Sequence, residues 1–373
     1  MEKTKRQSNF ELLRIFAIFL ICLSHVQQHG SEPLLTADNG YFNQPIIYLR
    51  LLIFEIGLPL GAFGNGLFIM ISGYFMNGND HIDTGKIAKK LMLQLGFAVG
   101  VLLIANAVWV TFLKNETLSL AKITINEFNS GWWFIGYYFF IIILAKIFLN
   151  GFTAKLTRNQ FKSLLLTILA LSQFSWSGSL LDGLAPDLRN LSIGVFYFLM
   201  GGYIARYNPF KNLKSYTIFL TIAASYLFRF LSQYNIVSQS IDEFIKSNSV
   251  GLLNFKQSVQ GRNNHGITAV IIAICIFELF IRLNIPYNAA INYIGKSTLM
   301  IYMIHENSFF QMFYKDADWM QTLKSSLLQY CLLWFKWAAI AFAVGLAAYC
   351  LYTLLGKLLP RIRSWFIVQE PSD

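Results

Sequence analysis

Long apolar runs separated by short polar segments occupy most of this chain. A helix needs about 20 mostly apolar residues to cross the hydrocarbon core of a bilayer. Runs of about that length occur at roughly residues 10–29, 50–75, 90–113, 132–150, 162–178, 190–206, 215–233, 266–283, 294–313 and 328–356. The pattern predicts an all-α, polytopic membrane protein with about ten transmembrane helices.

The second run has an unusual composition for a spanning helix. Five helix-weakening residues fall within it: Gly57, Pro59, Gly61, Gly64 and Gly66. Glycine and proline both disfavour a helix interior. We therefore expect this helix to be kinked or partly unwound.

Basic residues between the runs predict the orientation in the membrane. Cytoplasmic loops carry an excess of Lys and Arg. With the amino terminus inside, most of these residues fall in cytoplasmic segments, whereas most acidic residues fall outside. We therefore predict that both termini are cytoplasmic and that residues 357–373 form a short tail.

Composition supports one membrane domain over residues 1–373. Hydrophobic residues make up 55% of the chain and charged residues only 13%, about half the charged share of a soluble domain. The net charge of +11 is explained by topology, so we expect no nucleic acid partner. The four cysteines all lie in apolar runs, which indicates neither a disulfide framework nor a zinc site.

Two ionisable residues in the first run share one helix face. A charge at the bilayer centre costs about 2.5–3.5 kcal/mol on insertion scales, so such residues are functional candidates. Arg14 and His25 are eleven residues apart, which places them on one stripe, roughly 16 Å apart along the axis. Glu11 lies three residues before Arg14 and can pair with it. This stripe suits a long ligand with one anionic end, and we expect Arg14 and His25 to face a common internal tunnel.

A second buried imidazole is predicted in the ninth run. His305 is followed directly by Glu306, and interhelical hydrogen bonding is the alternative role for both. His25 and His29 have the spacing of two helical metal ligands, but no third His or Cys lies nearby in the sequence. We therefore predict no metal site.

Several short motifs occur in a definite order along the chain. They are Arg14-x10-His25, Ser72-Gly73-Tyr74-Phe75, Gly131-Trp132-Trp133-Phe134, Phe196 to Arg206 with Gly201 between them, and Ile294-Gly295-Lys296-Ser297 through Tyr302 to His305. Together they resemble the acyltransferase-three family of integral membrane acyltransferases, in its stand-alone form without a fused extracytoplasmic esterase-like domain. One departure is Lys86-x-x-Lys89-Lys90, where the family usually has paired arginines. Lysine keeps the charge but lacks the fork that clamps phosphate.

The resemblance implies an O-acetyltransferase. It would move an acetyl group from cytoplasmic acetyl-CoA, the co-substrate, to a hydroxyl of a cell-envelope or extracellular polysaccharide or its lipid-linked precursor. Arg14, supported by Glu11, would hold the coenzyme phosphates together with Lys86, Lys89 and Lys90. His25 would act as general base or as transient nucleophile, and the sequence leaves both open.

Further side chains are candidate supports for this reaction. Ser72 and Tyr74 could donate to a developing oxyanion, and His305 with Glu306 could orient His25 or relay a proton. Trp132, Trp133 and Tyr302 are candidates for substrate binding. For the two tryptophans, a place in the aromatic belt at the membrane interface is the alternative.

Other classes of function also fit a helical membrane protein. A transporter or flippase for a lipid-linked sugar would suit the glycine-rich second run. A structural or sensory protein would leave the Arg14–His25 stripe unexplained. We expect a multi-pass protein of a bacterial plasma membrane, whose partners are lipid, the glycan acceptor, and either glycan-biosynthesis proteins or a second copy of itself.

Overall fold

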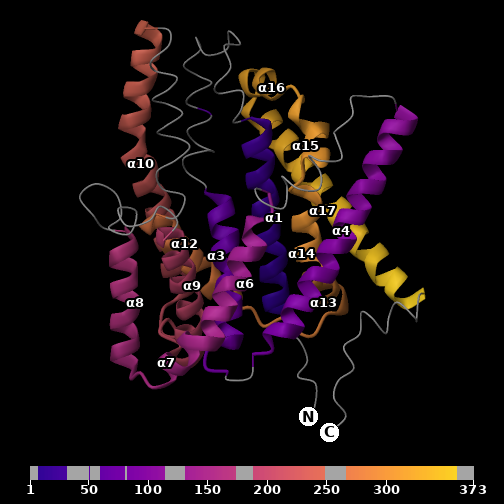
Figure 1. The fold of residues 1–373 in the computed structure, drawn as a ribbon. Coiled ribbons are helices and arrows are strands. Elements are labelled where there is room, and N and C mark those ends of the chain that lie inside the picture. Colours follow the sequence, from indigo (N-terminus) through magenta and orange to yellow (C-terminus); the bar gives the residue numbers. More distant parts are fainter. Residues whose placement is uncertain are drawn as a thin grey trace.

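The computed structural model describes residues 7–31, 50, 59–79, 82–113, 131–173, 188–247 and 266–358, with the side chains of residues 232–247 excepted. These residues form helices joined by short turns, and no strand occurs among them (Figure 1). The prediction of an all-α protein is therefore confirmed. The tail beyond Leu358 lies outside the described residues.

The helices follow the predicted apolar runs closely. They are α1 (Ser8–Gly30), α3 (Leu60–Met76), α4 (Thr84–Leu113), α6 (Trp133–Leu144), the π-helix η4 (Ala145–Leu149), α7 (Asn150–Ala154), α8 (Arg158–Gln173), α9 (Leu188–Tyr207), α10 (Ser215–Ser247), α12 (Ile267–Ile281), α13 (Ala289–Lys296), α14 (Thr298–His305), α15 (Ser308–Lys315), α16 (Trp319–Ser325) and α17 (Leu327–Leu358). Helix α10 extends well beyond the predicted end of the seventh run at residue 233.

Four stretches of the described chain are long and apolar enough to cross a membrane. They are Ser8–Gly30, Thr84–Phe112, Trp133–Ala154 and Leu327–Leu358. Shorter apolar helices cover Leu60–Met76, Ser215–Leu231 and Ile267–Ile281. These helices support a membrane protein, while the total of ten spans and the cytoplasmic position of both termini stay predictions.

The ninth run differs from its prediction as one helix. It forms three short helices, α13, α14 and α15. Glu306 leaves the helical conformation at φ −86° and ψ 67°, and Asn307 then caps α15 by accepting a hydrogen bond from the backbone of Phe309 at 2.8 Å. Because of this break, His305 ends one helix and Glu306 lies in the turn.

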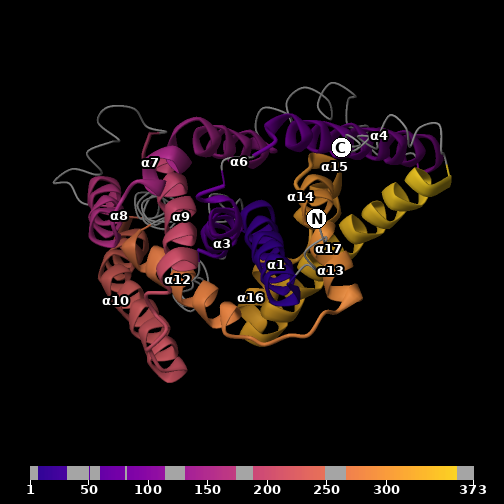
Figure 2. The ribbon, with the colours of Figure 1, turned by 90° about the horizontal axis from the view of Figure 1, so that it is seen from below.

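Helix α1 lies near the centre of the bundle. Seen along its axis, α1 and α3 are surrounded by the other helices (Figure 2). Leu13, Ala17, Ile18 and Cys22 of α1 are almost completely buried. A central helix that carries ionisable groups must satisfy them with groups from its neighbours, because neither lipid nor apolar side chains can do so.

The glycines of the second run serve close packing. Helix α3 is continuous from Leu60 to Met76, so the predicted kink or unwinding is wrong for this part, whereas Gly57 lies outside the described residues. A Cβ atom at Gly64 would lie 2.6 Å from the carbonyl oxygen of Ala17 in α1. A Cβ atom at Gly73 would collide with the backbone of Phe198 in α9. The missing side chains let three helix backbones approach one another.

The same close approach makes Gly201 of α9 sensitive to substitution. A Cβ atom there would collide with the carbonyl oxygen of Met70 in α3. We expect Gly201→Ala to lower the unfolding free energy by about 1–3 kcal/mol through overpacking. The thermal unfolding midpoint of purified protein in detergent measures this effect. Gly100→Ala in α4, where no described atom lies within 4 Å, is the control and should unfold no earlier than wild type. Equal midpoints for both variants would contradict this account.

Candidate active site

A cavity of about 290 Å³ lies between α1, α3, α4, α6, α13 and α14. Three cationic side chains line it: Arg14 near the start of α1, Lys90 near the start of α4, and Lys296 at the end of α13. The starts of α1 and α4 and the end of α13 lie at the same end of the bundle (Figure 1). Much of the remaining wall is apolar and includes Ile18, Ile21, Phe68, Leu91, Phe134 and Leu299. The cavity therefore combines a positive end with an apolar interior.

Arg14 is held in place by its neighbour on α1. Its Nη1 atom donates to Glu11 Oε1 at 2.5 Å. Glu11 is 3% exposed and packs against Gly295, where a side chain would collide with its carboxylate. The pairing that the spacing predicts is confirmed, and it fixes the guanidinium at the wall of the cavity.

The three lysines at the start of α4 do not share one environment. Lys90 lines the cavity. Lys86 lies one turn earlier and lines an adjoining groove together with Lys90. Lys89 is exposed and lines neither space. This follows from helix geometry, because residues four apart share a face and adjacent residues are rotated by about 100°.

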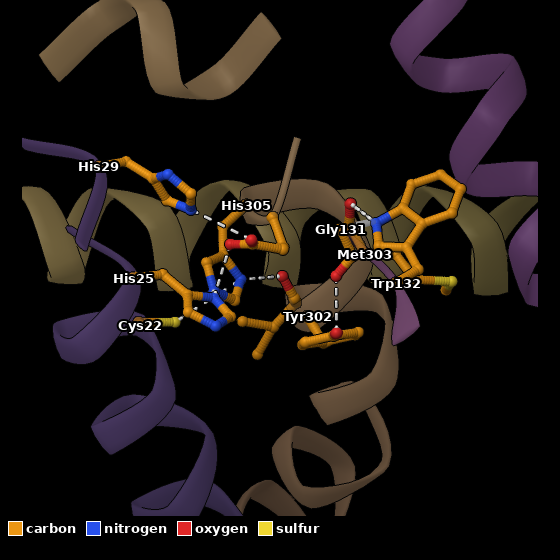
Figure 3. Close-up of polar contacts among 10 residues, drawn as sticks. Cys22, His25, His29, Gly131, Trp132, Tyr302, Met303 and His305 are labelled. Carbon is orange, nitrogen blue, oxygen red and sulfur yellow. Dashed lines mark hydrogen bonds and ion pairs between the residues drawn. The ribbon is translucent and has the colours of Figure 1, made fainter. Parts of the chain in front are cut away.

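His25 and His305 form a direct hydrogen bond between α1 and α14 (Figure 3). His305 Nδ1 lies 2.6 Å from the carbonyl oxygen of Ile301. A carbonyl oxygen can only accept, so this nitrogen carries a hydrogen and donates it. His305 Nε2 is then an acceptor, and His25 Nδ1 donates to it at 2.9 Å. The described polar contacts of His25 therefore all involve Nδ1, and in the neutral ring Nε2 carries a lone pair that no described residue occupies.

Glu306 places a carboxylate beside the same pair. Its Oε2 atom lies 2.7 Å from His25 Nδ1, a contact that becomes an ion pair when His25 is protonated, and its Oε1 atom lies 3.1 Å from His29 Nε2, one turn further along α1. The side chains of Glu306 and His25 are 9% and 14% exposed. A negative charge in this position stabilises a positive charge on His25 when Nε2 takes up a proton.

The structure also tests whether this cluster fits a metal ion. His25, His305 and Glu306 each offer one ligand atom, and these atoms all lie within 4.8 Å of one another. The tertiary structure thus brings together additional ligands that the sequence spacing did not reveal. The separations of 2.9 and 2.7 Å are those of hydrogen bonds and ion pairs. Ligands of a tetrahedral zinc, with bonds of about 2.0–2.1 Å, lie roughly 3.3 Å apart. The observed arrangement is a hydrogen-bonded relay.

Tyr302 connects the relay to the cavity. It lines the cavity, and its ring centroid lies 6.1 Å from that of His25. Its hydroxyl donates to the carbonyl oxygen of Gly131 at 2.8 Å. His25 itself is not part of the cavity wall; it lies one turn beyond Ile21, which is. Arg14 thus lines the cavity as expected, whereas His25 does not, so a common tunnel faced by both residues stays a prediction.

The two predicted tryptophans have different environments. Trp132 is 3% exposed, and its Nε1 atom donates to the carbonyl oxygen of Met303 at 3.1 Å. This bond ties the start of α6 to α14, two residues before His305. Trp133 is 48% exposed and packs on Tyr137. Neither lines the cavity, and substrate binding by either stays a prediction.

Ser72 and Tyr74 point into different environments. Ser72 lines the cavity, and its hydroxyl lies 3.0 Å from that of Tyr138. Tyr74 turns away and packs against Phe10, with ring centroids 4.7 Å apart. No described contact joins either residue to His25. Their role at an oxyanion stays a prediction, and only Ser72 lies on the cavity.

Sequence reasoning missed several residues of this site. Gln94 and Tyr138 line the cavity and were not candidates. Lys296 and His29 were noted in motifs but given no role. The spacing of Lys90 and Gln94, one helical turn apart, was a usable signal for Gln94. Tyr138 carried none, because its position depends on how α6 packs against α3.

A buried histidine relay beside a cavity with a cationic end, within a bundle of apolar helices, defines the class as a membrane-embedded enzyme. The chain belongs to the acyltransferase-three family: the family model described as an acyltransferase domain matches residues 7–356. No curated protein and no solved structure gives a significant match. The resemblance indicated by the ordered motifs is therefore confirmed, and the protein is an acyltransferase.

The relay predicts specific tautomers. We expect both His25 and His305 to carry their hydrogen on Nδ1 at neutral pH, because each donates from that nitrogen. Nitrogen-15 NMR of the imidazole groups distinguishes the tautomers, and spectra of His25→Asn and His305→Asn assign the signals. A hydrogen found on His25 Nε2 of the neutral ring would contradict the relay.

Proposed function

We propose that this acyltransferase is a multi-pass enzyme of a bacterial plasma membrane that moves an acetyl group from cytoplasmic acetyl-CoA to a hydroxyl of a cell-envelope polysaccharide or its lipid-linked precursor. One observation carries the proposal. Tyr302, whose ring centroid lies 6.1 Å from that of His25, lines a cavity whose wall also bears three cationic side chains, and no described hydrogen bond occupies His25 Nε2.

The dimensions of the site fit the coenzyme. Arg14 and His25 are separated by roughly 16 Å along α1, at about 1.5 Å per residue. The pantetheine arm joins the diphosphate of coenzyme A to its sulfur. Its length equals that of slightly more than four residues of extended peptide, roughly 15 Å at about 3.3–3.6 Å per residue. Phosphates at the cationic end therefore bring the thioester to His25.

The charges and the walls fit the same ligand. Arg14, Lys90 and Lys296 offer charge-assisted hydrogen bonds to phosphate oxygens. The apolar wall suits the methyl and methylene groups of the arm, which bind with a gain from the hydrophobic effect. The opposite orientation would place the phosphates among Ile21, Phe134 and Tyr302, where a charge is unpaired and costly.

The relay supplies the proton chemistry of acetyl transfer. As general base, His25 Nε2 removes the proton of the acceptor hydroxyl while the oxygen attacks the thioester carbonyl. The carbon–sulfur bond then breaks, and the thiolate takes the proton from the His25 imidazolium. As nucleophile, Nε2 would instead attack the thioester carbonyl, and the carbon–sulfur bond would break to release the thiolate. The acceptor hydroxyl would then attack the acetyl carbon, the carbon–nitrogen bond would break, and the thiolate would take the hydroxyl proton. In both routes Glu306 stabilises the positive charge on His25.

The transporter alternative has no support in the described structure. Helix α3 is continuous from Leu60 to Met76, and its glycines are explained by packing. The buried relay, in contrast, offers a base for acyl transfer, which moving a lipid-linked sugar across the membrane does not require.

The first test uses His25→Asn. The asparagine amide nitrogen mimics Nδ1 and keeps a donor towards His305 and Glu306, whereas nothing replaces Nε2. We expect acetyl transfer from radiolabelled acetyl-CoA to an acceptor glycan to fall about 10²–10⁴-fold. The thermal unfolding midpoint should stay close to that of wild type. A folded variant that keeps full activity would remove His25 from the mechanism.

The second test compares adjacent lysines. We expect Lys90→Gln to raise the KM for acetyl-CoA about tenfold or more, because a charge-assisted hydrogen bond to phosphate is lost. Lys89→Gln, which removes the same charge outside the cavity, should change this KM by no more than about twofold. With S-acetylpantetheine, which lacks the diphosphate, the two variants should be equal. If Lys90→Gln and Lys89→Gln raise the KM for acetyl-CoA equally, only the overall charge matters and the position of Lys90 on the cavity does not.

A further inference from the structure

Gln94 presents an unsatisfied polar group to the cavity. Its side chain lines the cavity and the residue is only 2% exposed. Its carbonyl oxygen Oε1 has no hydrogen-bond partner among the described residues. A buried polar group without a partner is costly and calls for an explanation, of which a bound ligand is one.

Gln94 is distinctive among the polar residues of the cavity wall. Ser72 and Tyr138 pair with each other at 3.0 Å, Tyr302 donates to Gly131, and Thr298 donates to Gly295. Of the residues that line this cavity, Gln94 is the one with a buried polar side-chain atom lacking a partner. Its neighbour Leu91 on the same wall is apolar and cannot supply one.

The position of Gln94 relative to the cationic end is set by α4. It lies four residues after Lys90, on the same helix face and about 6 Å further along the axis. A ligand anchored by phosphate at Lys90 therefore passes Gln94 at a depth of roughly 6 Å. A ligand segment as long as two residues of extended peptide, about 7 Å, reaches that depth.

We propose that Gln94 binds an amide of the pantetheine arm of the acyl donor, an inference that rests on the proposed function. Pantetheine contains two secondary amides, each with one N–H donor and one carbonyl acceptor. The amide nearer the phosphates lies about two extended residues from them, at the depth of Gln94. Its N–H would satisfy the orphaned Oε1, so Gln94 fixes the depth of the arm in the cavity.

Gln94→Leu tests this assignment with three donors. Acetyl-CoA and S-acetylpantetheine carry both amides, whereas S-acetyl-2-mercaptoethanol carries none. We expect the variant to lower kcat/KM roughly 3–10-fold for the first two, through KM, as is typical of one lost hydrogen bond. With the amide-free donor, the variant and wild type should agree within about twofold. Without ligand, the variant should unfold no earlier than wild type, because an unsatisfied buried group has been removed.

Asn106→Leu is the matched control. Asn106 is also a buried amide on α4, at 3% exposure, and does not line the cavity. Its kcat/KM should be unchanged with every donor. If kcat/KM of Gln94→Leu with acetyl-CoA is not reduced, the inference is overturned and the proposed function stays intact. The same holds if Gln94→Leu loses as much kcat/KM with the amide-free donor as with acetyl-CoA. A wild-type protein that transfers no acetyl from any donor would instead overturn the proposed function.

Discussion

Ionisable groups inside an apolar bundle are stable only when other polar groups satisfy them, and this constraint explains how α1 and α14 meet. The hydrogen bond between His25 and His305, at 2.9 Å, pairs the two imidazoles, and Glu306 supplies the compensating charge. The geometry depends on the turn after His305. If α14 continued as a helix through Asn307, Glu306 would rotate about 100° from His305 on the helix surface, and the two could not both face His25.

Around this contact, further hydrogen bonds fix both α14 and α1. Trp132 and Tyr302 link α14 to the segment that opens α6, while Trp334 of α17 donates to the carbonyl oxygen of Leu23 on α1 at 2.7 Å. A base whose orientation is fixed before substrate binds pays little reorganisation cost during the reaction. These three aromatic side chains thus hold backbone positions near the relay.

Arg14 and His25 lie on the same helix, α1. Arg14 lies on the cavity wall and His25 lies one turn beyond Ile21 of that wall, so a single helix sets the distance between them. The glycine contacts that bring α3 close to α1 and α9 keep α1 in the centre. In the proposed reaction the distance between Arg14 and His25 matches the length of the donor, and Gln94 on α4 fixes how deeply the donor enters the cavity.

Much of this protein could be predicted from the order of its residues. Each of the ten apolar runs contains helical backbone where the structure describes it, although the ninth is broken at Glu306, because apolar composition and length suffice to predict helices in lipid. The common stripe of Arg14 and His25 and the Glu11–Arg14 pair followed from the fixed rotation of about 100° per residue within one helix. The ordered motifs identified the family.

Contacts between helices required the tertiary structure. Only the packing of α14 against α1 brought His305 and Glu306 to His25, and only the packing of α4 put Lys90 and Gln94, but not Lys89, on the cavity. Ser72 and Tyr74 are two residues apart, and only the placement of α9, α6 and α1 around α3 decided which of them faces the cavity. The physical reason is that rotation within a helix is set by local backbone geometry, whereas the face that meets a neighbour is set by side-chain and glycine packing between segments far apart in the chain.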